Sequence, residues 1–423
     1  MLMVGLPSNA QKDTLIRDIV DRNIGGVLMF AYNISSPEQI RSLNAELQSY
    51  GRGHLLIAVD QEGGNVARLN ERNGYRKTHT AATLGATFQS EDSTRAQARM
   101  MAAWLRSAGF NVNLAPVVDV KVDPLSPAIG KLGRSFSSDE RTVAQHARWS
   151  IDEFSAQRIV TSLKHFPGHG SARSDSHLGF TDISDTWQER ELHPFRELIR
   201  NGYSDVIMTG HLFKRDWDSR YPVSLSRRAI TDILRGEMGF RGVVISDELF
   251  MKAIQDNYGF DEAVVRAINA GTDILLFNTN IYRQRSLSRY VIDLVSRKVS
   301  SGEIDASLID AAYDRIQKLK HDRISTHSEV IAGAGKASDF EIRNFPNPFD
   351  ASTVVEVNLP VRQQLRIEVY DAIGQHVRTL ANSDFSSGKH QIVFDGAELP
   401  SGFYFVRVVG EGFQATHSMA VRK

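Results

Sequence analysis

The sequence predicts an α/β protein: a (β/α)8 barrel of the TIM type, followed by a small all-β sandwich. Three observations predict this fold class. Eight short apolar, β-branched runs recur over about the first 320 residues, helical patterns separate them, and the sequence from residue 341 onward alternates between apolar and polar positions. Continuous apolar runs are typical of parallel strands buried on both faces, whereas strict alternation is typical of antiparallel strands with one solvated face.

The eight expected strands are residues 1–6, 25–30, 55–60, 112–119, 159–166, 205–211, 242–247 and 273–277. After the second strand, Ser36 can cap a helix, Pro37 takes its first position, and Gln39 completes a capping-box pattern. The segment 261–271 has apolar residues at helical spacing and ends at Gly271. An open doubly wound sheet is the alternative, but no G-x-G-x-x-G follows the first strand, which disfavours a dinucleotide-binding version.

Composition divides the chain into three parts. Residues 1–322 form the expected barrel, residues 323–340 are small, polar and unpatterned as in a linker, and residues 341–423 form the expected sandwich. The chain starts directly inside the first expected strand, with neither a charged leader segment nor a cleavage site before it. We therefore expect upstream residues, including a signal peptide and a first helix, to be missing from this chain.

Composition also restricts the partners. The 50 Lys and Arg residues balance 50 Asp and Glu residues, so nucleic acid is not an expected partner. The sequence contains no cysteine, which excludes disulfides, thiol catalysis and cysteine-based zinc sites. No run reaches the roughly 18 consecutive apolar residues that a transmembrane segment needs. The pattern does not predict an oligomeric state.

Polar side chains collect at the carboxyl ends of the expected strands, where barrel enzymes place their active sites. They are Asp60, Asp119, Lys164, His165, His211 and Asp247. Each strand-end aspartate has the alternative role of capping the following helix. Because neighbouring residues on an extended segment point in opposite directions, only one of Asp247 and Glu248 is expected to face the site, and the strand-end position favours Asp247 as a nucleophile, base or substrate anchor.

The loop after the fifth expected strand contains residues that suit either acid/base catalysis or metal binding. Asp175 and His177 form a D-x-H pair, in which the aspartate can orient the imidazole as a general acid/base. A surface loop with incidental polar residues is the alternative. Metal binding by His165, His169 and His177 is an alternative, but the intervening Gly and Pro residues argue against a helix that presents them together, so we predict no metal or cofactor.

Carboxylates and guanidinium groups suit a polar, uncharged ligand such as a sugar. Asp60 and Arg68 flank a tight turn at Gly63 and Gly64, and Arg134 follows in a separate loop. Such groups bind vicinal hydroxyls in pairs. A structural ion pair is the alternative role for each of them.

These residues lie in motifs that together resemble bacterial β-N-acetylglucosaminidases of glycoside hydrolase family 3, from Met1 to about Asp322. The motifs are KHFPGHG (164–170), DSH (175–177), DQEGG (60–64), GRSF (133–136), MTGH (208–211) and SDELFM (246–251). The resemblance implies that Asp247 is the nucleophile and that His177, partnered by Asp175, is the acid/base. The substrate-binding residues that it implies are Asp60, Arg68, Arg134, Lys164, His165, Met208 and His211.

The implied reaction is a retaining double displacement that removes terminal β-linked GlcNAc from peptidoglycan fragments or chitooligosaccharides. A histidine in place of the usual second carboxylate leaves phosphate open as an acceptor instead of water. The resemblance also leaves open a β-glucosidase or β-xylosidase of the same family, assistance by the substrate's acetamido group, and an inactive sugar-binding surface protein. The sequence departs from the family at Asn65, where arginine is common, and lacks the proline that usually follows DSH.

The C-terminal part resembles the sorting domain of the type IX secretion system. FPNPF (345–349), VYDAIGQHVRTL, LPSGFYFVRV and the terminal Lys423 carry the resemblance. It implies export across the outer membrane by the type IX machinery, with cleavage or anchoring of the tail, and hence a secreted or cell-surface protein. A generic, carbohydrate-binding sandwich is the alternative.

Overall fold

The computed structural model describes residues 1–8, 11–22, 24–51, 54–88, 90–176, 178–324, 341–359, 361–371, 375–410 and 413–423. The chain divides into two compact units, residues 1–326 and 327–423. In the described part of the chain, no helix is both long and apolar enough to cross a membrane. Of the segment expected to be a linker, residues 323 and 324 continue the first unit, and residues 325–340 lie outside the described ranges.

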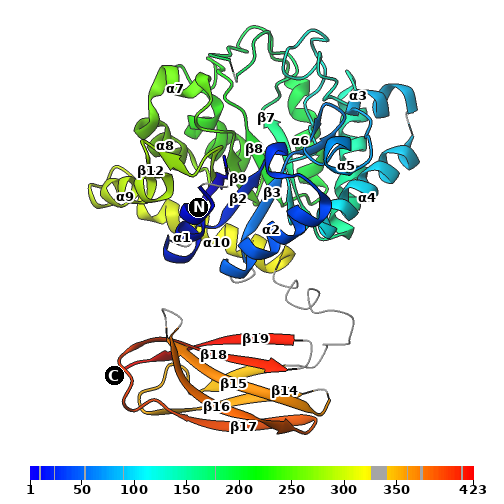
Figure 1. The fold of residues 1–423 in the computed structure, drawn as a ribbon. Helices are drawn as coiled ribbons and strands as arrows, with labels where there is room; N and C mark the ends of the chain where they lie inside the picture. The colour runs from blue at the N-terminus through cyan, green and yellow to red at the C-terminus, as the bar shows by residue number, and fades with distance from the viewer. Residues whose placement is uncertain are drawn as a thin grey trace. The chain divides into compact units, whose positions relative to one another are not determined.

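Eight parallel strands form the first unit (Figure 1), in the spatial order β10-β1-β2-β3-β6-β7-β8-β9. A parallel bridge between Ile245 and Ile274 joins the two outer strands, so the sheet closes on itself. The strands are β1 (Leu2–Gly5), β2 (Gly26–Met29), β3 (Leu56–Val59), β6 (Val112–Asn113), β7 (Val160–Phe166), β8 (Val206–Thr209), β9 (Val243–Ser246) and β10 (Leu275–Phe277). The predicted barrel is confirmed, with all eight strands inside their expected ranges.

One strand is much shorter than its apolar run suggests. Residues 112–119 were expected to be extended throughout, but β6 ends at Asn113. Pro116 has no backbone N–H and cannot donate to the neighbouring strand. Backbone hydrogen bonds persist on both sides of Pro116: the N–H of Leu114 donates to the carbonyl of Val59 at 2.9 Å, and the N–H of Val118 donates to the carbonyl of Lys164 at 2.9 Å. The chain therefore leaves the regular strand after Asn113 and reaches Asp119 through an irregular segment that keeps some backbone hydrogen bonds to its neighbours.

Helices surround the strands, as expected for this fold. They are α1 (Lys12–Arg22), α2 (Pro37–Tyr50), α3 (Ala81–Thr83), α4 (Glu91–Ser107), α5 (Glu140–Ala156), α6 (His193–Arg200), α7 (Lys252–Tyr258), α8 (Phe260–Ala270), α9 (Leu287–Ser300) and α10 (Ala306–Arg323), with a π-helical segment at Arg228–Glu237. Ser36 caps α2 as predicted, but the Gln39 side chain accepts from the N–H of Ser35 rather than Ser36. Gly271 ends α8 in the left-handed conformation, with φ of 104°.

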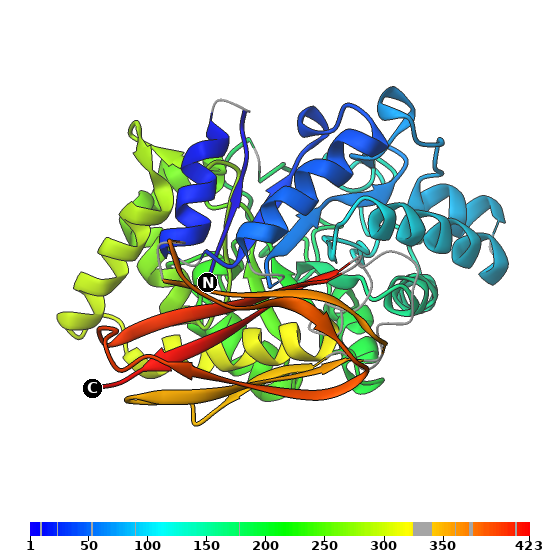
Figure 2. The same ribbon diagram turned by 60° about the horizontal axis from the view of Figure 1, so that its bottom comes forward.

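The barrel interior is apolar, and α10 closes one end of it. Ile316 and Leu319 of α10 pack against interior side chains that include Met3, Leu56 and Val206. Figures 1 and 2 show α10, in yellow, crossing the barrel at that end. At the opposite end, the carboxyl ends of the strands lead into the loops that contain the polar motifs.

The second unit is an antiparallel β-sandwich. Its two sheets have the orders β13-β14-β17 and β16-β15-β18-β19. In β14, buried residues alternate with more exposed ones, and Val355 and Val357 join the core between the sheets. The strands are β13 (Glu341–Phe345), β14 (Ser352–Leu359), β15 (Gln363–Asp371), β16 (His376–Phe385), β17 (Gly388–Asp395), β18 (Gly402–Gly410) and β19 (Phe413–Val421). The fold class predicted for this part is confirmed.

Candidate active site

A buried lysine organises the polar groups at the carboxyl ends of β3 and β7. Lys164 is only 2% exposed. Its Nζ lies 2.7 Å from Asp60 Oδ1 and 2.7 Å from Glu62 Oε1. Asp60 and Glu62 reach the same cation because alternate residues of an extended segment project to the same side. Arg68 completes this end of the network, with its Nη2 3.3 Å from Asp60 Oδ2.

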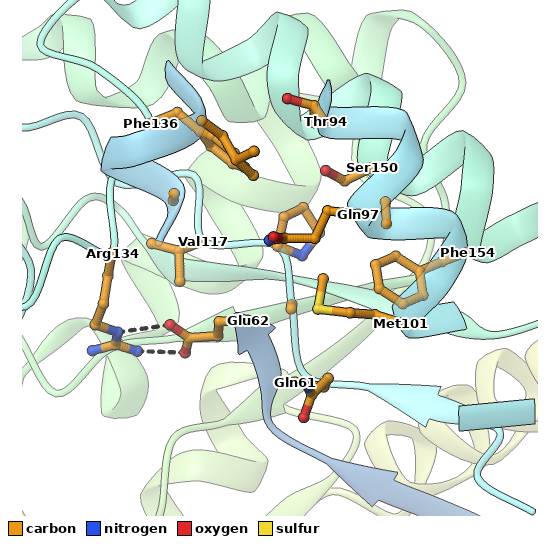
Figure 3. Close-up of a pocket in the computed structure, with 15 residues that line it drawn as sticks. Gln61, Glu62, Thr94, Gln97, Met101, Val117, Arg134, Phe136, Ser150 and Phe154 are labelled. Carbon is orange, nitrogen blue, oxygen red and sulfur yellow. Dashed lines mark hydrogen bonds and ion pairs between the residues drawn. The ribbon is translucent and has the colours of Figure 1, made fainter. Parts of the chain in front are cut away.

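Arg134 holds Glu62 from the other side in a two-bond contact. Its Nε and Nη2 each donate to a Glu62 oxygen at 2.8 Å (Figure 3). A turn in the left-handed conformation, with φ of 103° at Gly63 and 58° at Gly64, folds the chain back between Glu62 and Arg68. Asn65, at the tip of this turn, donates to the carbonyl of Leu132 at 3.0 Å. The side chain of Asn65 therefore connects this turn to the loop before Arg134.

The cations keep the buried carboxylates ionised. Burial alone raises the pKa of Glu62, but the charges of Arg134 and Lys164 outweigh it and lower that pKa to about 2. Burial also opposes ionisation of Asp60, and Lys164 and Arg68 lower its pKa below the usual value. The carboxylates in turn raise the pKa of Lys164 against its burial. The network is therefore fully charged at neutral pH.

His165 follows Lys164 and is fixed by Asp119, which is 0% exposed. Asp119 Oδ2 lies 2.8 Å from His165 Nδ1, and Asp119 Oδ1 accepts the backbone N–H of His165 at 3.0 Å. The opposite ring nitrogen, Nε2, lies 3.4 Å from Arg134 Nη2. This connects His165 to the network of Lys164, so five of the predicted substrate-binding residues meet in one cluster: Asp60, Arg68, Arg134, Lys164 and His165.

In the loop after β9, the neighbouring carboxylates of Asp247 and Glu248 make different hydrogen bonds. Glu248 Oε1 accepts the backbone N–H groups of Phe250 at 2.9 Å and Asn278 at 3.1 Å, so Glu248 is directed toward the backbone of its own loop and of the segment after β10. Asp247 is 9% exposed, and its Oδ1 accepts the N–H of Glu248 at 2.8 Å. Its nucleophilic role stays a prediction.

The MTGH segment lies beside this loop. His211 is buried, and its ring nitrogens lie 2.7 Å from Ser224 Oγ and 2.9 Å from the carbonyl oxygen of Glu248. His211 therefore orients the loop after Asp247. Met208, by contrast, packs in the apolar interior of the barrel.

The predicted acid/base pair is only partly described. His177 lies outside the described residues, so the Asp175–His177 pairing stays a prediction. Asp175 is half-buried, and its carbonyl accepts the N–H of Leu178 at 2.9 Å. Ser176, between the two, is 1% exposed.

Sequence reasoning missed two members of the site. Glu62 contacts Lys164 and Arg134 at 2.7 and 2.8 Å, and Asp119 contacts His165 at 2.8 Å, yet neither carboxylate was selected as a site residue. For Glu62, the signal was its position two residues after Asp60 on an extended segment. Asp119 was noted at a strand end, but its pairing with His165 joins residues 46 positions apart and is visible only in the folded barrel.

A small cavity lies behind the Glu62–Arg134 ion pair, between the barrel wall and helices α4 and α5 (Figure 3). Its volume is about 20 Å³, which has room for one water molecule and none for a sugar. Its lining includes Gln61, Glu62, Thr94, Gln97, Met101, Val117, Arg134, Phe136, Ser150 and Phe154. This cavity is therefore a packing feature behind the site rather than the substrate pocket.

Glu191 is a buried carboxyl near the site, and we predict that it destabilises the fold at alkaline pH. It is 0% exposed, and its Oε1 accepts the N–H of Gln188 at 3.0 Å. Burial raises its pKa from 4.5 to about 7, so the folded state holds this proton more tightly than the unfolded chain, and stability falls as the pH rises between these values. Replacing the group by a neutral amide, in Glu191→Gln, should raise the free energy of unfolding at pH 8 by about 3 kcal/mol.

Urea denaturation at pH 8 and pH 4 tests this prediction. At pH 4 the carboxyl is protonated in both states of the wild type, so the gain should vanish there. An equal stability change at both pH values would show that the effect comes from altered packing and not from ionisation.

Comparison with known proteins places both units in families. The glycosyl hydrolase family 3 N terminal domain matches residues 1–319, and the secretion system C-terminal sorting domain matches residues 343–422. A β-hexosaminidase of Tolumonas auensis is 38% identical over 261 residues, which cover 61% of this chain and 76% of that protein. β-Hexosaminidase A of Pseudoalteromonas piscicida is 32% identical over 329 residues, which cover 72% of this chain and 54% of that protein.

Solved structures agree. A family 3 β-N-acetylglucosaminidase from Paenibacillus sp. str. FPU-7 superposes with a TM-score of 0.71 at 33% identity, covering 79% of this chain and 62% of that one. A β-N-acetylhexosaminidase from Beutenbergia cavernae gives a TM-score of 0.69 at 28% identity, covering 76% of this chain and 96% of that one. The chain thus spans about half the length of the Pseudoalteromonas protein and less than two thirds of the Paenibacillus chain. The predicted resemblance is confirmed for both units: the chain carries a secretion sorting domain at its C-terminus, and by its barrel it belongs to glycosyl hydrolase family 3.

Proposed function

We propose that the protein is a retaining, exo-acting β-N-acetylglucosaminidase that removes terminal β-linked GlcNAc from chitooligosaccharides or peptidoglycan fragments. The observation that carries the proposal is the cluster around Lys164, in which the predicted sugar-binding residues are joined by ion pairs at the carboxyl end of the barrel strands. Relatives named β-hexosaminidase and β-N-acetylglucosaminidase support the same activity.

Charge balance in the cluster supports a neutral ligand. Three carboxylates, of Asp60, Glu62 and Asp119, stand against three cations, of Lys164, Arg68 and Arg134. These charges offset one another, so the cluster has no net positive charge that would select an anionic ligand. Its side chains can still donate hydrogen bonds to, and accept them from, the hydroxyl and amide groups of a sugar. This favours a sugar as the ligand, and water over phosphate as the acceptor.

The proposed reaction has two steps. Asp247 attacks the anomeric carbon while His177, oriented by Asp175, protonates the leaving oxygen. The deprotonated His177 then takes a proton from water, which attacks the same carbon, releases the sugar with retained configuration and regenerates Asp247. The cluster of Lys164 holds the sugar ring in place during both steps.

Parallel assays test the proposal. Nitrophenol release from the β-N-acetylglucosaminide and from the β-glucoside should differ strongly in favour of the acetamido sugar, with no stimulation by phosphate. Equal rates on both sugars would favour a β-glucosidase. Phosphate dependence would identify a phosphorylase, and inactivity on both would favour a sugar-binding protein.

The C-terminal sorting domain leads to a proposal for localisation. We infer that the type IX machinery exports the protein to the cell surface or the medium. Expression in a host with that machinery, with and without residues 334–423, tests this. The shortened chain should keep its specific activity in cell extracts but stay inside the cells, and its appearance in the medium would contradict the role of the tail.

A further inference from the structure

A chain of buried contacts runs from Asp119 toward the segment that contains Asp175 and His177. Asp119 Oδ1 accepts two backbone N–H groups, from His165 at 3.0 Å and from His169 at 2.8 Å. Asp119 Oδ2 also lies 2.8 Å from the His165 ring. One fully buried carboxylate therefore fixes both the sugar-binding His165 and the start of the loop that follows β7.

His169 extends this chain of contacts to the next part of the loop. Its Nε2 lies 3.2 Å from Ser176 Oγ, and both residues are buried, at 2% and 1% exposed. Burial, together with the nearby His165, lowers the pKa of His169 to about 4, so its ring is neutral at physiological pH. A neutral imidazole offers one donor and one acceptor, which suits a hydroxyl partner.

The loop has a second attachment on the far side of His177. The N–H of Phe213 donates to the carbonyl of Thr181 at 2.8 Å, and the N–H of Ile183 donates to the carbonyl of Phe213 at 2.9 Å. Between the two attachments, Leu178 is 76% exposed. On the side of Asp175, Ser176 is held by its side-chain contact with His169, and its carbonyl accepts the N–H of Ala253 at 3.4 Å.

We propose that Asp119, His169 and Ser176 are positioning residues that couple the sugar-binding His165 to the loop carrying Asp175 and His177. The inference rests on the proposed function, because it assigns the acid/base role to that loop. None of the three residues needs to touch the substrate. Asp119 sets the backbone of both segments, and the His169–Ser176 contact transmits that placement to the residue directly before His177.

Leaving-group dependence gives the first test. In Ser176→Ala, kcat for methyl β-N-acetylglucosaminide, which needs protonation of its leaving group, should fall about tenfold, whereas kcat for the nitrophenyl glycoside should change by less than about threefold. KM should stay unchanged for both substrates, because His165 is still held by Asp119. Asp119→Asn should raise KM as well, since it also releases His165. Ser176→Thr keeps the hydroxyl and should restore the rate on the methyl glycoside.

The matched control is Ser174→Ala. Among the described residues, the contacts of Ser174 Oγ lie within the loop, to Thr181 Oγ1 at 3.2 Å and to the carbonyl of Phe180 at 3.4 Å. Its removal should leave the ratio of the two rates unchanged. Equal losses on both substrates in Ser176→Ala would overturn the proposal, because they would indicate a general structural defect.

Hydrogen exchange gives a readout that does not depend on activity. Peptides covering residues 171–183 should exchange faster in Ser176→Ala than in the wild type, while peptides from β1, β2 and β9 exchange at the same rate. Unchanged exchange in the loop would overturn the coupling. If the wild type cleaves no GlcNAc substrate, the proposed function fails, while this comparison still decides whether His169 and Ser176 hold the loop.

Discussion

Asp247→Asn is expected to lower hydrolysis of the nitrophenyl β-N-acetylglucosaminide by at least about 1,000-fold while leaving the thermal unfolding midpoint within a few degrees of the wild type. The amide keeps the size of the side chain and the acceptor that receives the N–H of Glu248. It is, however, a far weaker nucleophile than a carboxylate and carries no charge to stabilise an oxocarbenium-like transition state. The loss should therefore appear in kcat, with little change in KM.

Glu248→Gln is the matched control because it neutralises the adjacent carboxylate. Its amide oxygen can still accept from Phe250 and Asn278, so the loop should keep its shape. Activity of Glu248→Gln should stay within about tenfold of the wild type. If Asp247→Asn retained that much activity, or if Glu248→Gln lost as much as Asp247→Asn, the assignment of the nucleophile would be wrong.

A trapping experiment separates covalent catalysis from assistance by the acetamido group. A fluorinated GlcNAc derivative with a good leaving group should label the wild-type enzyme on Asp247, and mass spectrometry of peptides locates the label. Tight binding of a thiazoline-type inhibitor without labelling would instead support attack by the substrate's own acetamido oxygen, with Asp247 in a supporting role.

The fold was predictable from the sequence because the barrel strands are buried on both faces. Residues 55–59 and 242–245 are continuously apolar, and these runs overlap the observed strands β3 and β9. The same reasoning overestimated the length of the strand at 112–119. An apolar run indicates that a segment is buried, but it does not show that its backbone pairs regularly with a neighbouring strand. Pro116 and the residues around it are buried without belonging to a regular strand.

The site was less predictable because pairing between charged groups depends on distant parts of the chain. Strand-end position identified Asp60, Lys164 and His165 as polar residues of one face. It could not show that Glu62 bridges Lys164 and Arg134, since Glu62 and Arg134 are 72 positions apart and meet only in the folded chain. The local sequence pattern thus indicates which end of the barrel carries the site, whereas the pairing of charged side chains at that end is visible only in the tertiary structure.

Lys164→Met is expected to lower the free energy of unfolding by about 3–5 kcal/mol at pH 7.5, because it leaves buried carboxylates without their shared cation. Asp60 and Glu62 each lie 2.7 Å from Lys164 Nζ, and burial disfavours the ionised form of both. Methionine fills a similar volume, so lost packing contributes little. Sugar binding should be lost as well, since the cluster can no longer hold its geometry.

The pH dependence of this loss identifies its cause. In the wild type, Lys164 helps to keep the pKa of Glu62 at about 2 and that of Asp60 below its usual value, so both carboxylates stay ionised and their contribution to stability is lost only in strong acid. In Lys164→Met, burial and the neighbouring Glu62 carboxylate should raise the pKa of Asp60 above that of the unfolded chain, whereas Arg134 still pairs with Glu62 and keeps it ionised. The folded variant then binds an extra proton as the pH falls, so the gap to the wild type should narrow between pH 7.5 and pH 5.

Lys12→Met is the control for simply removing a lysine. Lys12 pairs with Glu46 at 2.9 Å, but the two side chains are 32% and 38% exposed, so this variant should lose less than about 1 kcal/mol. Urea denaturation of both variants at pH 7.5 and pH 5 makes the comparison. A loss in Lys164→Met no larger than in Lys12→Met, or one that does not change with pH, would show that Arg68 and Arg134 alone neutralise the site, and that Lys164 is retained for binding the sugar rather than for holding the carboxylates.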